Sequence, residues 1–258
     1  MQRNPLKILG FVLKTLLRLN LFQTLYFNFK WLPLNQAFRL PVHIYGKVKW
    51  ANKTGRFLIQ SSEIKFGMIV IGAKHEIVIC PDATTRIYNA GTVIFKGSAK
   101  LARGINLTLL EDSVLSIGKN FSIGSLSRII VFRKMSFGDQ VLISWETQFF
   151  DTDFHYLIDT NKEVKDNCSE VNIGNHVWIG TRVTVLKGTQ IANKSVVAAG
   201  SVCSGNYTEK YGESALLAGT PARFIKGEID YIADKKQERK LMEYFKKNPD
   251  TKVKWEHW

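Results

Sequence analysis

The sequence predicts an all-β solenoid, because apolar residues recur at every sixth position over its second half. Written in sixes from Val171, the chain reads VNIGNH, VWIGTR, VTVLKG, TQIANK, SVVAAG and SVCSGN. The third position of each hexad is aliphatic until Cys203, and a small residue often follows it. A period of six fits neither a helix nor an isolated hairpin, but it fits one flat face of a stacked coil. Three such faces make a coil of about 18 residues, with the aliphatic side chains pointing to its axis.

The pattern continues upstream in weaker form, which sets the extent of the predicted solenoid. Four positions are again six apart, namely Phe137, Ile143, Phe149 and His155. The frame slips by two residues between Ile123 and Val131, and a fainter version runs over residues 67–79. We therefore expect a solenoid over residues 56–218, of at most about nine coils. The polar stretch 156–170 is expected to be a loop outside the coil.

Two flanking segments complete the predicted organisation. Residues 1–55 are basic and rich in aromatic side chains, and residues 219–258 form an extension that we expect to be mostly helical. The composition of residues 228–247 is typical of a helix, and Asn248-Pro249 would end it. Such a helix is expected to cap the last coil or a neighbouring one, since an open solenoid edge needs a cover.

The charge of the chain is concentrated in its N-terminal segment. Lys and Arg number 36 against 22 Asp and Glu, a net charge of +14, and the first acid is Glu63, after ten basic residues. Such a segment favours contact with nucleic acid, an acidic membrane surface or an anionic substrate. No nucleic-acid-binding motif is recognisable, so we do not expect that partner.

The apolar run Ile8 to Phe27 raises the question of a membrane. Lys14, Arg18 and Asn20 interrupt it, so it does not predict a spanning helix. No cleavage site of a signal peptide follows. We interpret the segment first as a cap on the fold, and peripheral contact with a bilayer is the alternative. Three widely spaced cysteines indicate a reducing compartment, so we expect a cytoplasmic protein that can contact the inner face of the membrane.

Several short motifs over residues 137–226, about a third of the chain, add a family resemblance. In order they are DTDFH (151–155), IGNHVWIGT (173–181), VAAGSV (197–202) and AGTPAR (218–223). With these motifs the chain resembles the hexapeptide-repeat acyltransferases, which have a left-handed parallel β-helix. It is most similar to the branch of the maltose, galactoside and nodulation-factor O-acetyltransferases and of the enzymes that acetylate capsule and lipopolysaccharide sugars. The left hand of the helix is implied by the resemblance alone.

The resemblance implies an active site. His155 matches the catalytic histidine of the family, the general base for a sugar hydroxyl, and an imidazole with a pKa near neutrality suits that task. Asp153 or Asp151 would hold the imidazole or position the acceptor. The resemblance also implies an acetyl-CoA site at six matching positions, with cations near the nucleotide phosphates. These positions are Trp178, Thr181, Ala199, Ser204, Arg223 and Lys226.

The sequence also departs from the family pattern. The upstream asparagine that orients the acceptor in the sugar acetyltransferases has no counterpart in residues 122–128, and the N-terminal helical domain of the maltose enzyme is not recognisable. These departures bring the chain closer to the polysaccharide-modifying branch. His43, His75, His176 and His257 show no partner pattern and are interpreted as surface or packing residues.

Three functions of different classes follow. The first is O-acetyl transfer from acetyl-CoA to a sugar of a surface glycan or its precursor, by a homotrimer whose grooves lie between subunits. The second is a zinc enzyme like the γ-class carbonic anhydrases, which needs three converging histidines, two of them close in sequence; His155 and His176 are not such a pair, so we expect no metal. The third is a non-catalytic solenoid that serves as a binding module. We favour the first, because only it explains DTDFH, VWIGT and AAGSV together.

Overall fold

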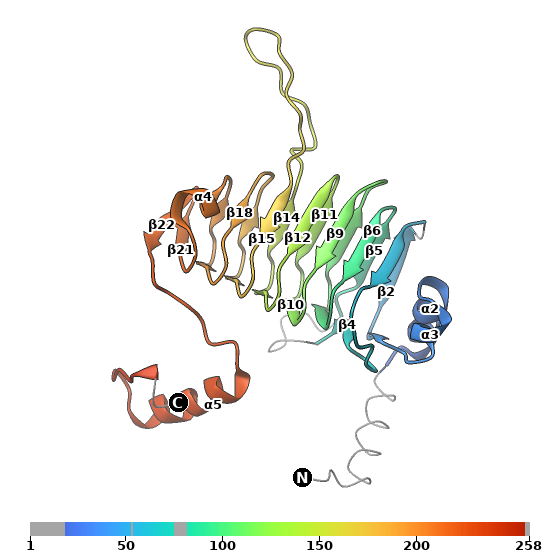
Figure 1. Cartoon of the computed structure of the whole chain (residues 1–258), viewed down its shortest axis with the longest axis horizontal. Coiled ribbons are helices and arrows are strands. Elements are labelled where there is room, and N and C mark those ends of the chain that lie inside the picture. Colours follow the sequence, from blue (N-terminus) through green and yellow to red (C-terminus); the bar gives the residue numbers. More distant parts are fainter. Residues whose placement is uncertain (1–18, 53, 75–81, 256–258) are drawn as a thin grey trace.

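The described residues, 19–52, 54–74 and 82–255 of a computed structural model, form a parallel β-solenoid with three sheets and a C-terminal helix (Figure 1), as predicted. Consecutive strands pass from the first sheet to the second and on to the third, so that three strands make one coil. The first sheet contains β1 (Val42–Ile44), β4 (Ile69–Ala73), β7 (Ala99–Ala102), β10 (Phe121–Ile123), β13 (Leu142–Ile143), β16 (Trp178–Ile179), β19 (Val196–Val197), β21 (Leu216–Gly219) and β22 (Ala222–Lys226). The second contains β2 (Val48–Asn52), β5 (Thr85–Asn89), β8 (Asn106–Leu109), β11 (Arg128–Val131), β14 (Gln148–Phe150), β17 (Thr184–Val185) and β20 (Val202–Cys203). The third contains β3 (Arg56–Ile59), β6 (Thr92–Phe95), β9 (Val114–Ile117), β12 (Lys134–Phe137), β15 (Val171–Ile173) and β18 (Gln190–Ile191).

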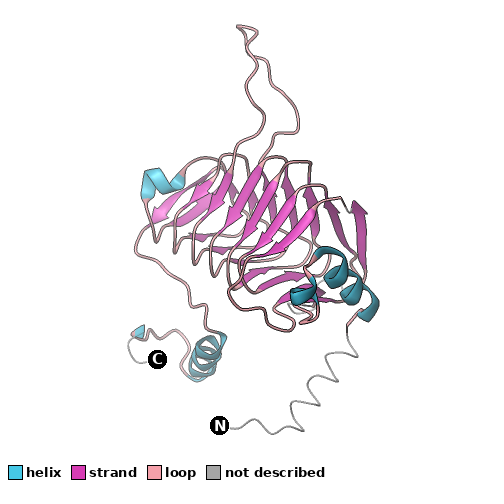
Figure 2. Ribbon diagram, turned by 45° about the vertical axis from the view of Figure 1, so that its right-hand side comes forward, coloured by secondary structure: helices cyan, strands magenta, loops and turns pink. Residues whose placement is uncertain are grey.

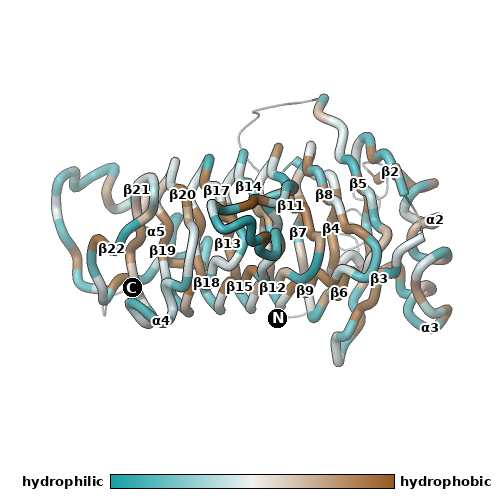
Figure 3. Tube along the Cα trace, turned by 90° about the horizontal axis from the view of Figure 1, so that it is seen from above, coloured by the Kyte–Doolittle hydropathy of each residue, from teal (hydrophilic) through white to brown (hydrophobic). Residues whose placement is uncertain are grey.

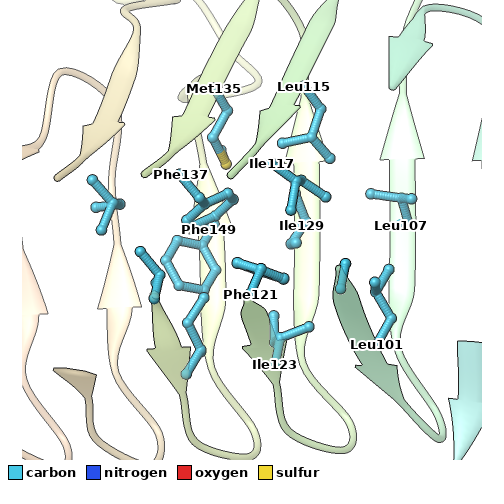
Figure 4. Close-up of a cluster of buried hydrophobic side chains, with 14 of the residues drawn as sticks. Leu101, Leu107, Leu115, Ile117, Phe121, Ile123, Ile129, Met135, Phe137 and Phe149 are labelled. Carbon is cyan, nitrogen blue, oxygen red and sulfur yellow. The ribbon is translucent and has the colours of Figure 1, made fainter. Parts of the chain in front are cut away.

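The hexad positions stack along the axis as expected. Ile173 pairs in register with Ile191 of the following coil, and both side chains are buried. Inward side chains of successive coils meet in the interior, where Phe137 contacts Phe121 and Phe149 (Figure 4). One continuous apolar core therefore fills the solenoid along its length.

The frame slip has a structural cause. In β11 both Ile129 and Val131 point inward, whereas the shorter strands β16 and β17 have one inward aliphatic residue each, Ile179 and Val185. Coils of this middle region are correspondingly longer than three hexads, as the register of Phe137 with Ile117 shows. The hexad frame that contains Ile123 therefore ends at Ile129, and the frame that contains Phe137 begins at Val131.

The solenoid begins earlier than residue 56, since β1 and β2 already belong to its first coil. Helices α2 (Leu21–Trp31) and α3 (Leu34–Ala37) lie at this end (Figures 1 and 2). The Asn28 amide bonds both the N–H and the C=O of Val42, and Thr24 Oγ1 accepts from the N–H of Ile44. These contacts satisfy the open edge of β1. The predicted capping is therefore present over residues 19–38, and residues 1–18 lie outside the described part.

Residues 151–170 leave the coil as a long protruding loop, at the place where the sequence predicts one (Figure 1). Seen from above, this loop lies over the middle of the solenoid (Figure 3). The C-terminal region differs from the expectation. A short helix α4 (Tyr207–Tyr211) follows β20, and the antiparallel β22 pairs with β21 at the end of the first sheet. An extended arm over residues 227–234 then leads to α5 (Lys235–Lys247), which lies beside the first sheet rather than over the last coil (Figure 1). The helix starts late because the Asp234 carboxylate caps the N–H of Lys236.

Candidate active site

His155 lies where the protruding loop leaves the corner after β14, and its side chain is exposed. The preceding Phe154 has φ +63° and packs edge-on against the rings of Phe132 and Phe150, with centroids 5.6 Å away in both cases. The N–H of His155 donates to the carbonyl of Asp153 at 2.7 Å. Aromatic packing and this tight turn fix the backbone at the base of the loop and leave the imidazole facing solvent.

The two aspartates of DTDFH have different environments. Asp151 is buried, and its carboxylate accepts from the N–H groups of Phe132, Arg133 and Lys134, each at 2.8 Å. Asp153 is exposed and forms an ion pair with Lys187 at 2.6 Å. Asp151 is thus used in holding a corner of the coil. Among the described residues, the hydrogen bonds of Asp151 and the ion pair of Asp153 are made with groups other than the His155 ring.

More ion pairs hold the base of the loop. Arg133 bonds Asp166 at 2.7 Å, and Lys134 pairs with Glu170 at 2.8 Å. The Arg133 guanidinium lowers the pKa of the Asp166 carboxyl below its usual value, chiefly through this hydrogen bond. Lys187 also donates to the Asp166 carbonyl at 3.2 Å. Lys187 thus joins the loop to the next coil. This role has no signal in the sequence, because the whole loop and three further strands lie between Lys187 and Asp153.

Trp178, Thr181 and Ala199 lie together along the first sheet and the corner that follows it. The Trp178 side chain on β16 is 39% exposed, and its indole N–H donates to Ser144 Oγ at 3.4 Å. Thr181 Oγ1 donates to the Trp145 carbonyl at 2.9 Å. At this corner a Cβ on Gly180 would come within 2.7 Å of the Ala199 nitrogen, so glycine is required between the two coils. The result is a closely stacked wall with one exposed indole.

The remaining predicted residues lie elsewhere on the solenoid. Ser204 follows β20 in the second sheet, and its N–H donates to the Tyr207 hydroxyl at 3.1 Å. Arg223 and Lys226 are exposed on the terminal strand β22. Within one chain, therefore, the structure places His155 and the wall at Trp178 on different faces of the coil.

Next to Trp178 the structure reveals a contact that sequence reasoning missed. The His176 ring stacks on Tyr231 of the C-terminal arm with centroids 4.4 Å apart, and its Nε2 lies 2.9 Å from Asp230. The Tyr231 hydroxyl donates to the Gln140 carbonyl at 2.7 Å, and its ring lies 6.1 Å from that of Trp178. Burial raises the pKa of Tyr231 to about 12. His176, expected to be an ordinary surface or packing residue, therefore ties the arm across the first sheet.

Beyond this contact the arm and α5 enclose a cleft of about 1300 Å³ against the outer side of the first sheet. Apolar side chains from both sides line it, among them Met68 and Leu142 from the coils and Leu241 from the helix. Throughout residues 19–52, 54–74 and 82–255, no three His, Cys, Asp or Glu side chains gather as a metal site would require. No helix in those same ranges is long and apolar enough to cross a membrane.

The solenoid, its hexad motifs and the exposed histidine of DTDFH agree with the resemblance to the hexapeptide-repeat acyltransferases. Two of the relatives that match the chain are named as O-acetyltransferases. The galactoside O-acetyltransferase of Escherichia coli K12 is 30% identical over 114 residues, which are 44% of this chain and 54% of that protein. A second protein of that strain, WbbJ, is named for O-acetyl transfer in lipopolysaccharide biosynthesis; it is 28% identical over 54% of this chain and 74% of its own length.

A third relative is an uncharacterized 24.8 kDa protein of the cps region of Klebsiella pneumoniae, 28% identical over 63% of this chain and 71% of its own. Among solved structures, the polySia-specific acetyltransferase NeuO aligns with a TM-score of 0.47 and 16% identity, over 83% of this chain and 90% of that one. The polysialic acid O-acetyltransferase OatWY aligns with a TM-score of 0.43 and 22% identity, over 79% of this chain and 98% of that one. No family model matches the chain.

Proposed function

We propose that the protein transfers an acetyl group from acetyl-CoA to a hydroxyl of a surface polysaccharide or of its precursor, with His155 as the general base. The observation that carries the proposal is the placement of His155, whose backbone is fixed by packing while its imidazole is open to a large acceptor. Relatives named for lipopolysaccharide and galactoside acetylation support a sugar acceptor.

The chemistry needs one base and an activated donor. The imidazole takes the proton of the acceptor hydroxyl as the oxygen attacks the thioester carbon. The C–S bond of the tetrahedral intermediate then breaks, and the protonated imidazole returns its proton to the departing thiolate. The products are the acetyl ester and free CoA, so the bonds and protons balance without a covalent acyl-enzyme.

The donor is expected to lie along the wall at Trp178. Trp178 and Thr181 would line the pantetheine groove, and Ala199 would meet the acyl-CoA arm. Ser204, after β20, would meet the same arm. Arg223 and Lys226 would pair with the CoA phosphates, since exposed cations on a short strand suit charge-assisted contacts. Because His155 and Trp178 lie on different faces of one chain, we infer that a complete site needs two subunits of a homotrimer. The Lys187 ion pair leaves Asp153 the role of positioning, either of the loop or of the acceptor.

The test is acceptor-dependent release of thiol from acetyl-CoA, measured over a panel of capsule and lipopolysaccharide glycans. Loss of a general base should lower kcat by about 10²- to 10⁴-fold in His155→Ala. Lys162→Ala, an exposed change on the same loop, serves as the matched control and should keep the wild-type rate. Equal rates for wild type and His155→Ala would refute the role of His155. A wild type that binds CoA but releases no thiol with any glycan would instead favour a binding module.

A further inference from the structure

The capping helix α2 turns polar as well as apolar side chains toward the coil. Its polar side chains Thr24 and Asn28 are buried, because they bond the edge of β1. Gln23 also faces the coil, where it bonds the Val48 carbonyl at 3.1 Å and the indole N–H of Trp50 at 3.1 Å. Of the large side chains on this helix, Phe27 enters the core. Polar side chains occupy part of the inward face, and several apolar side chains of the helix lie on the outside.

That outward apolar surface extends across both helices of the cap. Phe22 is 79% exposed and Phe38, next to α3, is 73% exposed. The rings of Phe29 and Phe38 meet at 5.4 Å, which joins the two helices into one surface. We call this surface the outer face of the cap; its residues are Phe22, Leu25, Phe29, Leu34 and Phe38, and all are exposed. Contiguous exposed apolar surface on a soluble domain usually marks a contact site.

The surroundings of this face are basic. Lys30 lies over the rings of Tyr26 and Trp31, at 5.4 and 4.8 Å from their centroids, so its charge stays beside the aromatic side chains. Arg39 follows Phe38 directly in the chain. Residues 1–62 contain ten Lys and Arg and no acid, and four of these cations precede α2. Aromatic and apolar side chains next to Lys and Arg, without acids, match an anionic lipid surface in both polarity and charge.

We propose that the outer face of the cap binds the surface of an anionic lipid bilayer, with its aromatic side chains at the level of the headgroups. The charge pattern argues for lipid rather than for a second copy, because two such basic faces would repel each other. The proposal does not depend on the acetyltransferase reaction, so its test can fail without affecting the proposed function.

The experiment is co-sedimentation of the full chain with vesicles of phosphatidylcholine alone or of phosphatidylcholine with phosphatidylglycerol. The wild type should bind the anionic vesicles, and binding should weaken at high salt because the cations are then screened. The double variant Phe22→Ser/Phe38→Ser should bind the anionic vesicles at least about tenfold more weakly than the wild type, since it removes two interfacial anchors. Both side chains are exposed, so these changes leave the contacts with β1 in place.

Leu157→Ser/Ile158→Ser is the matched control, because these side chains are 73% and 66% exposed on the protruding loop. It should bind vesicles like the wild type. Equal binding by the cap variant and the wild type would overturn the proposal, as would no binding of the wild type to anionic vesicles. A cap variant of lower oligomeric mass than the wild type, measured without lipid, would also overturn it, since a second copy would then cover the face.

Discussion

At the scale of residues, the two aspartates of DTDFH show that the place of a carboxylate in the fold decides its role. Asp151 and Asp153 carry the same chemical group and only Thr152 separates them, yet one is buried under three N–H donors and the other is exposed beside a lysine. On a straight strand such alternate residues would face the same side, so the turn of the chain at this corner is what sends them to different surroundings. From the sequence, both were equal candidates to support His155, and only the surrounding backbone distinguishes them.

Replacing Asp151 by asparagine should destabilise the fold. The amide keeps one acceptor oxygen but brings an NH₂ group toward three N–H donors, so buried donors lose their partner, at a cost of about 1–3 kcal/mol in the free energy of unfolding. Thermal or urea denaturation measures the loss. Asp153→Asn is the control, because an exposed ion pair contributes about 1 kcal/mol at most. Equal stability of the two variants would contradict this account of Asp151.

His43 should make stability depend on pH. Burial lowers the pKa of its ring below 6.5, its Nε2 has no hydrogen-bond partner among the described residues, and the ring of Phe66 packs against it at 4.4 Å. The unfolded chain therefore takes up the proton first as the pH falls, so the folded state loses stability below about pH 6.5 until its own pKa is reached. Urea denaturation at pH 7 and pH 5 should show the loss.

Two substitutions of His43 isolate this effect. His43→Phe and His43→Asn share only the absence of a titrating ring, and both should reduce the loss of stability between pH 7 and pH 5 by the same amount. If both variants lose as much stability between pH 7 and pH 5 as the wild type does, the pH dependence comes from groups other than His43.

At the scale of elements, strands were more predictable than the segments that join or cover them. Ile173, Ile179 and their successors are visible as hexads because the late coils have equal lengths and short strands. The early coils hide the same geometry, since Ile69 pairs with Ala99 across an inserted segment, and no fixed period survives such insertions. The loop after DTDFH could be predicted from its polarity, whereas the place where it is anchored depends on Lys187 in the next coil.

The path of the C-terminal arm had no signal in the sequence. His176 and Tyr231 are far apart in the chain, and neither residue type nor spacing marks the pair. Periodicity identifies faces that pack on their own neighbours in the chain, and a single aromatic contact across that distance has no period. The motif residues of the candidate site could be found from the sequence. Their placement on two different faces could be seen only in the folded coil.

The cap can be tested as an element. Asn28→Ala removes two hydrogen bonds to Val42 and leaves buried backbone groups of β1 unsatisfied, so the free energy of unfolding should fall by about 2–4 kcal/mol. Asn161→Ala, at the exposed tip of the protruding loop, is the matched control and should change stability by less than about 0.5 kcal/mol. Chemical denaturation gives both values. An unchanged Asn28→Ala variant would show that the cap does not stabilise the first coil.

At the scale of the whole molecule, the proposal that two subunits share one site predicts complementation. His155→Ala and Trp178→Ala should each be poorly active alone. When both chains are mixed, denatured together and refolded, some interfaces will join an intact His155 to an intact Trp178, and thiol release should reappear. The control mixes two preparations of His155→Ala and should stay inactive. No recovery in mixtures shown to be trimeric would place the whole site within one chain.

If a bilayer binds at the cap, the length of the solenoid fixes the height of His155 above the lipid surface. His155 follows β14, the fifth strand of the second sheet, so four strand spacings separate it from the first coil, about 19 Å at about 4.8 Å per step. A cyclic trimer keeps its three sites at one height above the lipid. Sugars attached directly to a lipid carrier would stay below that height. Only chains that have already grown outward would be modified, and acetylation would then be timed by glycan length.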